Sequence, residues 1–186
     1  KKTTIKFLNW FAKYNIIPKG MALKMVLLSS NVIEKFQQEV FETFNTNIGA
    51  SKIKLSEEQK RSLKIMNFSN DKFRVHVLQG TTGSGKTIVY FSALKEIMKK
   101  GLQGLILLPE IGLTGQFEKK FFEFFGIKPA VWHSGISKKK KEVIWSGVAN
   151  GEIKVVIGAR SSLFLPFKKL GSIIVDEEHD QSYKQD

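Results

Sequence analysis

The chain has 186 residues, 42% of them hydrophobic, which is enough for one compact domain with a core and a small appendage. It contains no cysteine, which excludes disulfides and thiolate metal sites, and no apolar run approaches the roughly 20 residues that span a bilayer. We therefore expect a soluble, cytoplasmic protein without a membrane partner. The net charge of +13 favours a polyanionic partner such as nucleic acid, with a lysine-rich solvated surface as the alternative.

The first fifty residues are predicted to be helical. Four aromatic residues between positions 7 and 14 follow helical spacing. The segment that begins at Pro18 is expected to end this helix. An apolar run at 21–28 and an aromatic stripe at 36–44 predict further helices, followed by a linker at 45–51. Aromatic stripes of this kind are typical of core packing. The first stripe consists of Phe7, Trp10, Phe11 and Tyr14.

Beyond position 52, apolar strands alternate with helices. A helix with an acidic first turn follows Ser56, as suits the helix dipole. The remaining predicted elements are a strand at 75–78, a helix at 86–100, a strand at 105–108, a helix at 114–125, a strand at 129–132, a helix at 137–149, and strands at 154–157 and 172–175. This alternation of short apolar strands with helices is typical of an α/β fold with a parallel sheet and flanking helices.

A complete phosphate-binding motif lies between the first predicted strand and the helix that follows it. The pattern G-x-x-x-x-G-K-[S/T] is matched by Gly80, Thr81, Thr82, Gly83, Ser84, Gly85, Lys86 and Thr87. Glycines let backbone N–H groups approach phosphate, and the helix N-terminus favours an anion. Lys86 can reach the β- and γ-phosphates, and Thr87 can place its hydroxyl on Mg²⁺. The motif predicts binding of ATP with Mg²⁺.

Two adjacent carboxylates, Asp176 and Glu177, follow the last predicted strand. In this setting Asp176 is expected to hold Mg²⁺, usually through water, and Glu177 to act as general base toward the attacking water. A solvated acidic turn is the alternative. His179 either links hydrolysis to movement of nucleic acid or is a loop histidine without a role.

Three longer segments carry a resemblance to a known family. Residues 108–114 (LPEIGLT), 158–164 (GARSSLF) and 176–185 (DEEHDQSYKQ) resemble the PriA family of replication-restart helicases, which belongs to superfamily 2. The resemblance is strong over 52–186 and weak over 1–28. It implies that 52–186 form a RecA-like first motor lobe that binds ATP. Residues 1–50 are then a small helical N-terminal remnant of a DNA-binding region or linker.

The resemblance also implies a function and further site residues. The parent protein is expected to be an ATP-dependent 3′–5′ DNA helicase or translocase that acts in replication restart and primosome assembly. Gln59 resembles the adenine-reading glutamine, because an amide both donates to and accepts from adenine. The expected DNA contacts are Pro109, Glu110, Thr114, Arg160, Ser161, Tyr183 and Lys184, with His179 as a coupling residue.

The chain departs from the family pattern at several places. Little sequence remains for the winged-helix domain, and the second motor lobe, its arginine finger and the cysteine zinc cluster are absent, so zinc is not expected here. We expect a monomer that binds nucleotide weakly and does not hydrolyse or unwind. Its expected partners are single-stranded or forked DNA, with primosome and single-strand-binding proteins for the parent.

Other functions remain open at the level of sequence. The parent could be another superfamily 2 motor, such as a double-strand translocase or an RNA helicase. The chain alone could also be a non-catalytic nucleotide- and DNA-binding module. The basic run Lys138–Lys141 is typical of a solvated helix face, with phosphate contact as the alternative.

Overall fold

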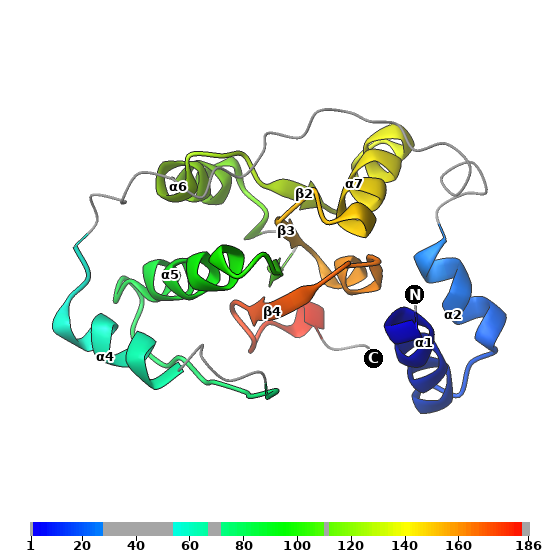
Figure 1. The fold of residues 1–186 in the computed structure, drawn as a ribbon, viewed down its shortest axis with the longest axis horizontal. Helices are drawn as coiled ribbons and strands as arrows, with labels where there is room; N and C mark the ends of the chain where they lie inside the picture. Colours follow the sequence, from blue (N-terminus) through cyan, green and yellow to red (C-terminus); the bar gives the residue numbers. More distant parts are fainter. Residues whose placement is uncertain (1, 28–53, 67–71, 110–111, 184–186) are drawn as a thin grey trace.

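The computed structural model describes residues 2–27, 54–66, 72–109 and 112–183. Within these ranges, four parallel strands form one sheet in the order β2-β3-β1-β4 (Figure 1). The strands are β1 (Gln103–Leu107), β2 (Ala130–Trp132), β3 (Val155–Gly158) and β4 (Leu170–Val175). The central strand β1 pairs on both sides, so that Leu105 lies beside Val156 on β3 and Ile173 on β4. The predicted α/β fold with a parallel sheet is confirmed.

The helices begin and end close to the predicted positions. They are α1 (Lys2–Tyr14), α2 (Lys19–Val26), α4 (Glu57–Met66), α5 (Lys86–Lys99), α6 (Gly115–Phe125) and α7 (Lys138–Asn150), with 3-10 turns η2 (Arg160–Phe164) and η3 (Gln181–Tyr183). Local chemistry explains the boundaries: Thr114 and Ser137 accept the N-capping hydrogen bonds of α6 and α7. Gly126 and Gly151 end the same two helices in the left-handed conformation. The helix predicted at 36–44 and the linker at 45–51 lie outside the described residues.

The strand predicted at 75–78 is wrong: these residues lie outside the sheet. The side chains of Phe73, Val75 and Val77 are 92%, 76% and 90% exposed. A strand is stable only beside a neighbour that accepts its ladder hydrogen bonds, and β4, at one edge of the sheet, pairs among the described residues with β1 alone. The apolar run indicated β-propensity correctly but carried no information about a partner strand.

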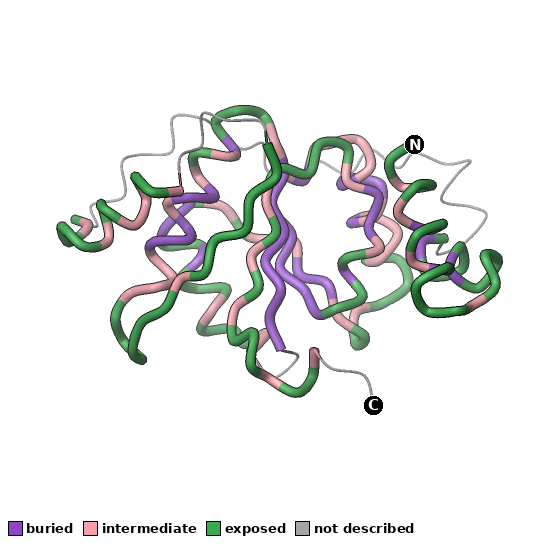
Figure 2. Tube along the Cα trace, turned by 90° about the horizontal axis from the view of Figure 1, so that it is seen from below, coloured by how far each residue is buried: buried purple, intermediate pink, exposed green. Residues whose placement is uncertain are grey.

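The sheet is covered on both faces, which makes a three-layer arrangement (Figures 1 and 2). On one face α5 and α6 pack their aromatic residues against Ile106 of β1 and Ile157 of β3. On the other face α7 packs against Leu105 and Val156. Alternate residues of each strand therefore enter opposite cores, as the period of a strand requires. In Figure 2 the central strands are mostly buried, and further buried residues lie on the helices.

A buried glutamine, Gln103, holds the segment that leads into β4 through hydrogen bonds. The side chain of Gln103 is 1% exposed and donates to the carbonyls of Val148 and Ile153, at 3.1 and 2.7 Å. Its oxygen accepts from the backbone N–H groups of Lys168 and Lys169 at 2.8 and 2.9 Å. All of its polar atoms are therefore satisfied, and one side chain ties the end of α7 and the start of β4 to the central strand.

The two N-terminal helices form a small separate core against η2. Phe7 and Phe11 contact the ring of Phe164, with ring centroids 5.9 and 5.0 Å apart. The predicted packing role is thus correct for these two residues. It is wrong for Trp10 and Tyr14, which are 56% and 73% exposed and stack on each other instead. The described residues include no helix that is long and apolar enough to cross a bilayer.

Candidate functional site

The predicted site residues gather where parallel strands end. Pro109 follows β1, Arg160 follows β3 and Asp176 follows β4. Backbone hydrogen bonds hold these exits side by side: the N–H of Asp176 donates to Leu107 O, and that of Leu108 donates to Gly158 O, both at 3.1 Å. The carboxyl edge of a parallel sheet is the usual place for a ligand site in an α/β fold.

The phosphate loop is an exposed turn that leads directly into α5. The N–H of Ser84 donates to Thr81 O at 3.2 Å and closes the turn. Gly83 and Gly85 have φ angles of +83° and +81°, a region that side chains with a Cβ rarely adopt. Gly85 is the N-cap residue of α5, so the first N–H groups of the helix lie beside the loop and favour an anion there.

Lys86 spans the loop from the first turn of α5. Its ammonium group donates to the carbonyl oxygens of Gly80 and Thr81 at 2.6 and 3.0 Å. Two neutral carbonyl acceptors thus hold the positive charge of Lys86 beside the loop. A phosphate oxygen is a stronger acceptor for an ammonium group than a carbonyl is, so an anion in the loop would compete well for this donor.

Gln59 is connected to the same loop, although it lies 25 residues away from it in the chain. Its side-chain amide donates to Ser84 O at 3.2 Å, and its oxygen accepts from the N–H of Ser56 at 2.9 Å. Ser56 in return accepts from the N–H of Gln59, which completes a capping box at the start of α4. The structure therefore brings the predicted adenine-reading residue to the phosphate loop.

Asp176 is held by groups from three directions. The hydroxyl of Tyr90, on α5, donates to its Oδ2 at 2.8 Å. Its Oδ1 accepts from the N–H of Glu177 at 3.0 Å, and its backbone carbonyl accepts from the Tyr183 hydroxyl at 3.0 Å. The carboxylate and the phosphate-loop helix are thus joined by one direct hydrogen bond.

Sequence reasoning did not single out Tyr90. Its position on α5, four residues after Lys86 and three after Thr87, places it on the same helix face as these two residues. That spacing was available in the sequence, but its contact with a carboxylate 86 residues away was not. Burial first, and then the nearby negative charge of Asp176, raise the pKa of Tyr90 far above its usual value. The phenol therefore remains a protonated donor.

The turn after Asp176 holds the predicted general base in a strained conformation. Glu177 has a φ angle of +51°, uncommon for a residue with a side chain, and its carbonyl accepts from the N–H of Asp180 at 2.8 Å. Asp180 in turn accepts from the hydroxyl and the N–H of Ser182, and these bonds hold the pKa of its carboxyl below the usual range. Glu177 and His179 are exposed side chains.

The residues predicted for Mg²⁺ form an all-oxygen set. The hydroxyl of Tyr90 donates to Asp176, and Thr87 lies three residues before Tyr90 on α5, so both predicted ligands are connected to the same part of this helix. Oxygen ligands from one or two side chains, completed by water and phosphate, are what Mg²⁺ prefers. No cluster of three His, Cys, Asp or Glu suited to a metal occurs in the described part of the chain.

The predicted DNA contacts differ in their surroundings. Pro109 is buried, and the hydroxyl of Thr114 accepts from the N–H of Phe117 as the cap of α6. Arg160 is exposed on η2, whereas the Ser161 hydroxyl accepts from the ring N–H of Trp132 at 3.2 Å. Burial first, and then the charge of Asp176, raise the pKa of the half-buried Tyr183. Glu110 and Lys184 lie outside the described residues.

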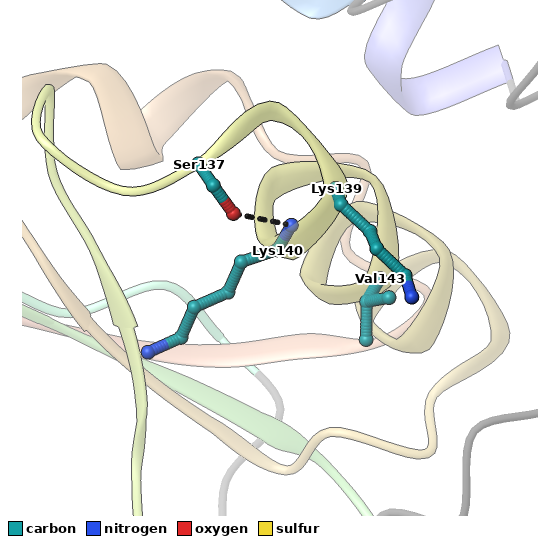
Figure 3. Close-up of a pocket in the computed structure, with 4 residues that line it drawn as sticks. All are labelled: Ser137, Lys139, Lys140 and Val143. Carbon is teal, nitrogen blue, oxygen red and sulfur yellow. Dashed lines mark hydrogen bonds between the residues drawn. The ribbon is translucent and has the colours of Figure 1, made fainter.

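A shallow hollow at the start of α7 is separate from these residues. It is lined by Ser137, Lys139, Lys140 and Val143, and its volume is about 190 Å³ (Figure 3). The hydroxyl of Ser137 is engaged as a cap by the N–H of Lys140 at 3.3 Å. Figure 3 shows the side chains of Lys139 and Lys140 pointing in different directions, so they do not converge on one anion. The geometry agrees with the solvated-face interpretation of the basic run.

Comparison with known proteins places this arrangement in a family. Residues 56–186 match the model of the DEAD/DEAH box helicase family. The replication restart protein PriA of Rickettsia felis is 42% identical over 185 residues, which cover 98% of this chain and 27% of the relative. PriA of Bacillus subtilis is 41% identical over 134 residues, which cover 71% of this chain and 17% of the relative. The chain thus spans about a quarter, or less, of the length of these relatives. It belongs to the DEAD/DEAH box helicase family and is similar to the replication restart proteins PriA.

Proposed function

We propose that residues 52–186 are the ATP-binding first lobe of a DNA helicase that acts in replication restart, preceded by a helical remnant at 1–50. One observation carries the nucleotide part of the proposal: the hydrogen bond from Tyr90 to Asp176 joins the helix of the phosphate loop to the acidic end of β4. A nucleoside triphosphate with Mg²⁺ needs these two groups within reach of each other.

The roles of the binding residues follow from their positions. The backbone N–H groups between Gly80 and Thr87 cradle the phosphates, and Lys86 exchanges its two carbonyl partners for phosphate oxygens. Thr87 and Asp176 hold Mg²⁺, which when bound neutralises charge on the phosphates. Gln59, already anchored to the loop through Ser84, reads the adenine edge with its amide.

Glu177 is the proposed general base toward the attacking water. Its carboxylate is exposed and follows the proposed metal-holding aspartate directly, and no salt bridge between described residues includes it. Glu177→Gln would keep the shape of the side chain and remove the proton acceptor. Hydrolysis of ATP, where the parent protein performs it, is expected to fall by at least about 100-fold.

The nucleic-acid part of the proposal rests on the family and on charge. The relatives are named replication restart proteins, and the net charge of +13 suits a polyanion. Arg160 and Ser161 on η2 are proposed to hold the backbone of a single strand, and the further proposed DNA contacts are Pro109, Glu110, Thr114, Tyr183 and Lys184. His179 is proposed to couple the two sites. The parent is proposed to move 3′ to 5′ on single-stranded or forked DNA with primosome and single-strand-binding partners.

One alternative competes with this proposal for the parent protein, and a second concerns the chain alone. In the first, the parent is a different superfamily 2 motor; stimulation of its ATPase by RNA rather than by DNA would favour that alternative. In the second, this chain is a monomeric nucleotide- and DNA-binding module without turnover of its own. We propose weak nucleotide binding, negligible hydrolysis and no unwinding for the chain alone. Robust turnover by the purified chain, abolished by Glu177→Gln, would contradict this.

The most direct test measures nucleotide binding with and without single-stranded DNA. A fluorescent ADP analogue is titrated with the chain in Mg²⁺ buffer, and the same titration is made with Lys86→Ala. Binding that depends on Lys86 is expected. Equal binding by both proteins would overturn the nucleotide site. The affinity for single-stranded DNA should fall with salt, with a slope near −0.7 per phosphate neutralised.

A further inference from the structure

Tyr90 is a buried polar residue whose bond to Asp176 supports the function described above, but to which that function assigns no role of its own. Its side chain is 6% exposed and lies on the inner face of α5, with its ring edge-on to Phe91 at a centroid distance of 5.2 Å. A phenylalanine would fill the same space in this aromatic core. The hydroxyl is therefore not required for packing, and what it contacts must account for its presence.

The hydroxyl contacts one of the two side chains that are proposed to hold Mg²⁺ and lies about one helical turn from the other. It donates to Oδ2 of Asp176 at 2.8 Å, and Thr87 precedes Tyr90 by three residues on α5. The other carboxylate oxygen, Oδ1, accepts from the N–H of Glu177 at 3.0 Å. Both oxygens of Asp176 are thus engaged by donors in defined positions, so the orientation of the carboxylate is fixed before any ligand arrives.

Fixing this orientation matters because Mg²⁺ tolerates little deviation from octahedral geometry. Side chains that hydrogen-bond to a metal ligand set its direction, and their removal typically costs about 10- to 100-fold in metal affinity. A carboxylate that turns freely must be ordered when the metal binds, and this ordering weakens binding. The hydroxyl of Tyr90 orders the Asp176 carboxylate in advance, so metal binding is not weakened by this ordering.

We propose that Tyr90 is a positioning residue for the metal: its hydroxyl holds the Asp176 carboxylate toward Thr87 and so links the helix of the phosphate loop to the acidic strand end. This inference rests on the proposed nucleotide site. It assigns a role to a residue that acts through Asp176 and does not itself touch the nucleotide.

The test measures how strongly nucleotide binding depends on Mg²⁺. The Mg²⁺ concentration that half-saturates binding of a fluorescent ADP analogue is determined for the unaltered chain and for Tyr90→Phe. We expect this concentration to rise about 10-fold in Tyr90→Phe. Affinity for the analogue in EDTA is expected to stay unchanged, because the phosphate loop itself is intact. An equal Mg²⁺ requirement in the two proteins would overturn the inference.

Two further proteins separate positioning from a structural effect. Tyr14→Phe makes the same chemical change at an exposed position on α1 and is expected to leave the Mg²⁺ requirement unchanged. In Asp176→Asn, adding Tyr90→Phe is expected to have no further effect, since the hydroxyl acts through the carboxylate. Independent losses in the double variant would contradict the inference, as would a Tyr90→Phe chain that no longer folds, because the hydroxyl would then serve the core.

Failure of the proposed nucleotide site gives a different result. If the unaltered chain does not bind the analogue in Mg²⁺ buffer, the proposed function is overturned and the inference with it. If the unaltered chain binds in a Mg²⁺-dependent way and Tyr90→Phe behaves identically, only the role of Tyr90 is overturned.

Discussion

The two halves of the candidate site are stabilised in different ways. The phosphate loop is exposed from Gly80 to Ser84, and most of its hydrogen bonds join residues within a few positions of one another, such as Lys86 to Gly80 and Ser84 to Thr81. The acidic half is held by long-range bonds, from Tyr90 to the carboxylate of Asp176 and from Asp176 to the end of β1. The loop is therefore a local structure, whereas the acidic half exists only when the sheet is formed.

This difference predicts that removing the ligand-facing lysine of the loop alters binding, whereas removing the buried side chain that positions β4 alters folding. The loop has few tertiary contacts to lose, and its groups are directed at a ligand. Strand β4 and the aspartate that follows it, by contrast, are positioned by a buried glutamine, a strand neighbour and a tyrosine from α5. Four substitutions, taken from the largest expected effect to the smallest, test this separation.

Replacing Gln103 with leucine should destabilise the sheet most. The substitution leaves the carbonyls of Val148 and Ile153 and the N–H groups of Lys168 and Lys169 without their present partner. We expect the free energy of unfolding to fall by about 3–4 kcal/mol. Urea denaturation followed by circular dichroism measures it. Gln116→Leu, at an exposed position in the first turn of α6, is the control and should change stability little.

Replacing Lys86 with alanine should weaken nucleotide binding and leave the stability of the fold almost unchanged. In the described contacts, the ammonium group bonds only to exposed carbonyls of the loop. The free energy of unfolding should therefore change by less than about 0.5 kcal/mol. Nucleotide affinity should fall about 100-fold, because charge-assisted hydrogen bonds to phosphate are lost. Lys99→Ala, which removes an exposed lysine paired with Glu96 at the other end of α5, should leave affinity unchanged. A large loss of stability in Lys86→Ala would mean that the loop is not a local structure.

Replacing Gly85 with alanine should cost more than the same change at Gly83. Both residues have φ near +80°, so alanine strains the backbone by about 1–2 kcal/mol at either site. A Cβ at Gly85 would also lie 2.5 Å from Nε2 of Gln59, whereas one at Gly83 meets nothing within 4 Å. We expect Gly85→Ala to be less stable than Gly83→Ala by about 1 kcal/mol, the value of one displaced hydrogen bond. Equal unfolding midpoints would show that Gln59 is not held against the loop.

Replacing Tyr183 with phenylalanine should have the smallest effect. It removes one hydrogen bond, from the phenol to the carbonyl of Asp176, while the ring keeps its place beside the core under α7. A loss of about 1 kcal/mol in unfolding free energy is expected, with nucleotide affinity preserved. Thermal denaturation in parallel with Tyr14→Phe separates the effect of this partly buried bond from the general effect of removing a hydroxyl. A change in stability equal to that of Tyr14→Phe would place the Tyr183 side chain in solvent.

Much of the fold was predictable because its signals are local. Thr114 and Ser137 cap the helices they precede, and the apolar runs around Leu105 and Val156 formed the expected central strands. The run at 75–78 carried the same local signal and formed no strand, because pairing depends on a neighbour that lies elsewhere in the chain. The exposure of Trp10 and Tyr14 also depends on a distant part of the chain. η2 packs against only one side of α1, and Phe7 and Phe11 lie on that side.

The sequence by itself determined the phosphate loop, because each of its requirements is met by residues adjacent in the chain: glycines where φ is positive, a lysine and a threonine at the start of a helix. It also indicated the acidic pair after an apolar strand. Only the tertiary structure decided that Gln59 lies against the loop, that Gln103 positions β4 and that Tyr90 orients Asp176. These contacts join residues 25 to 86 positions apart, and a hydrogen bond between such residues depends on the packing of the layers rather than on local propensity.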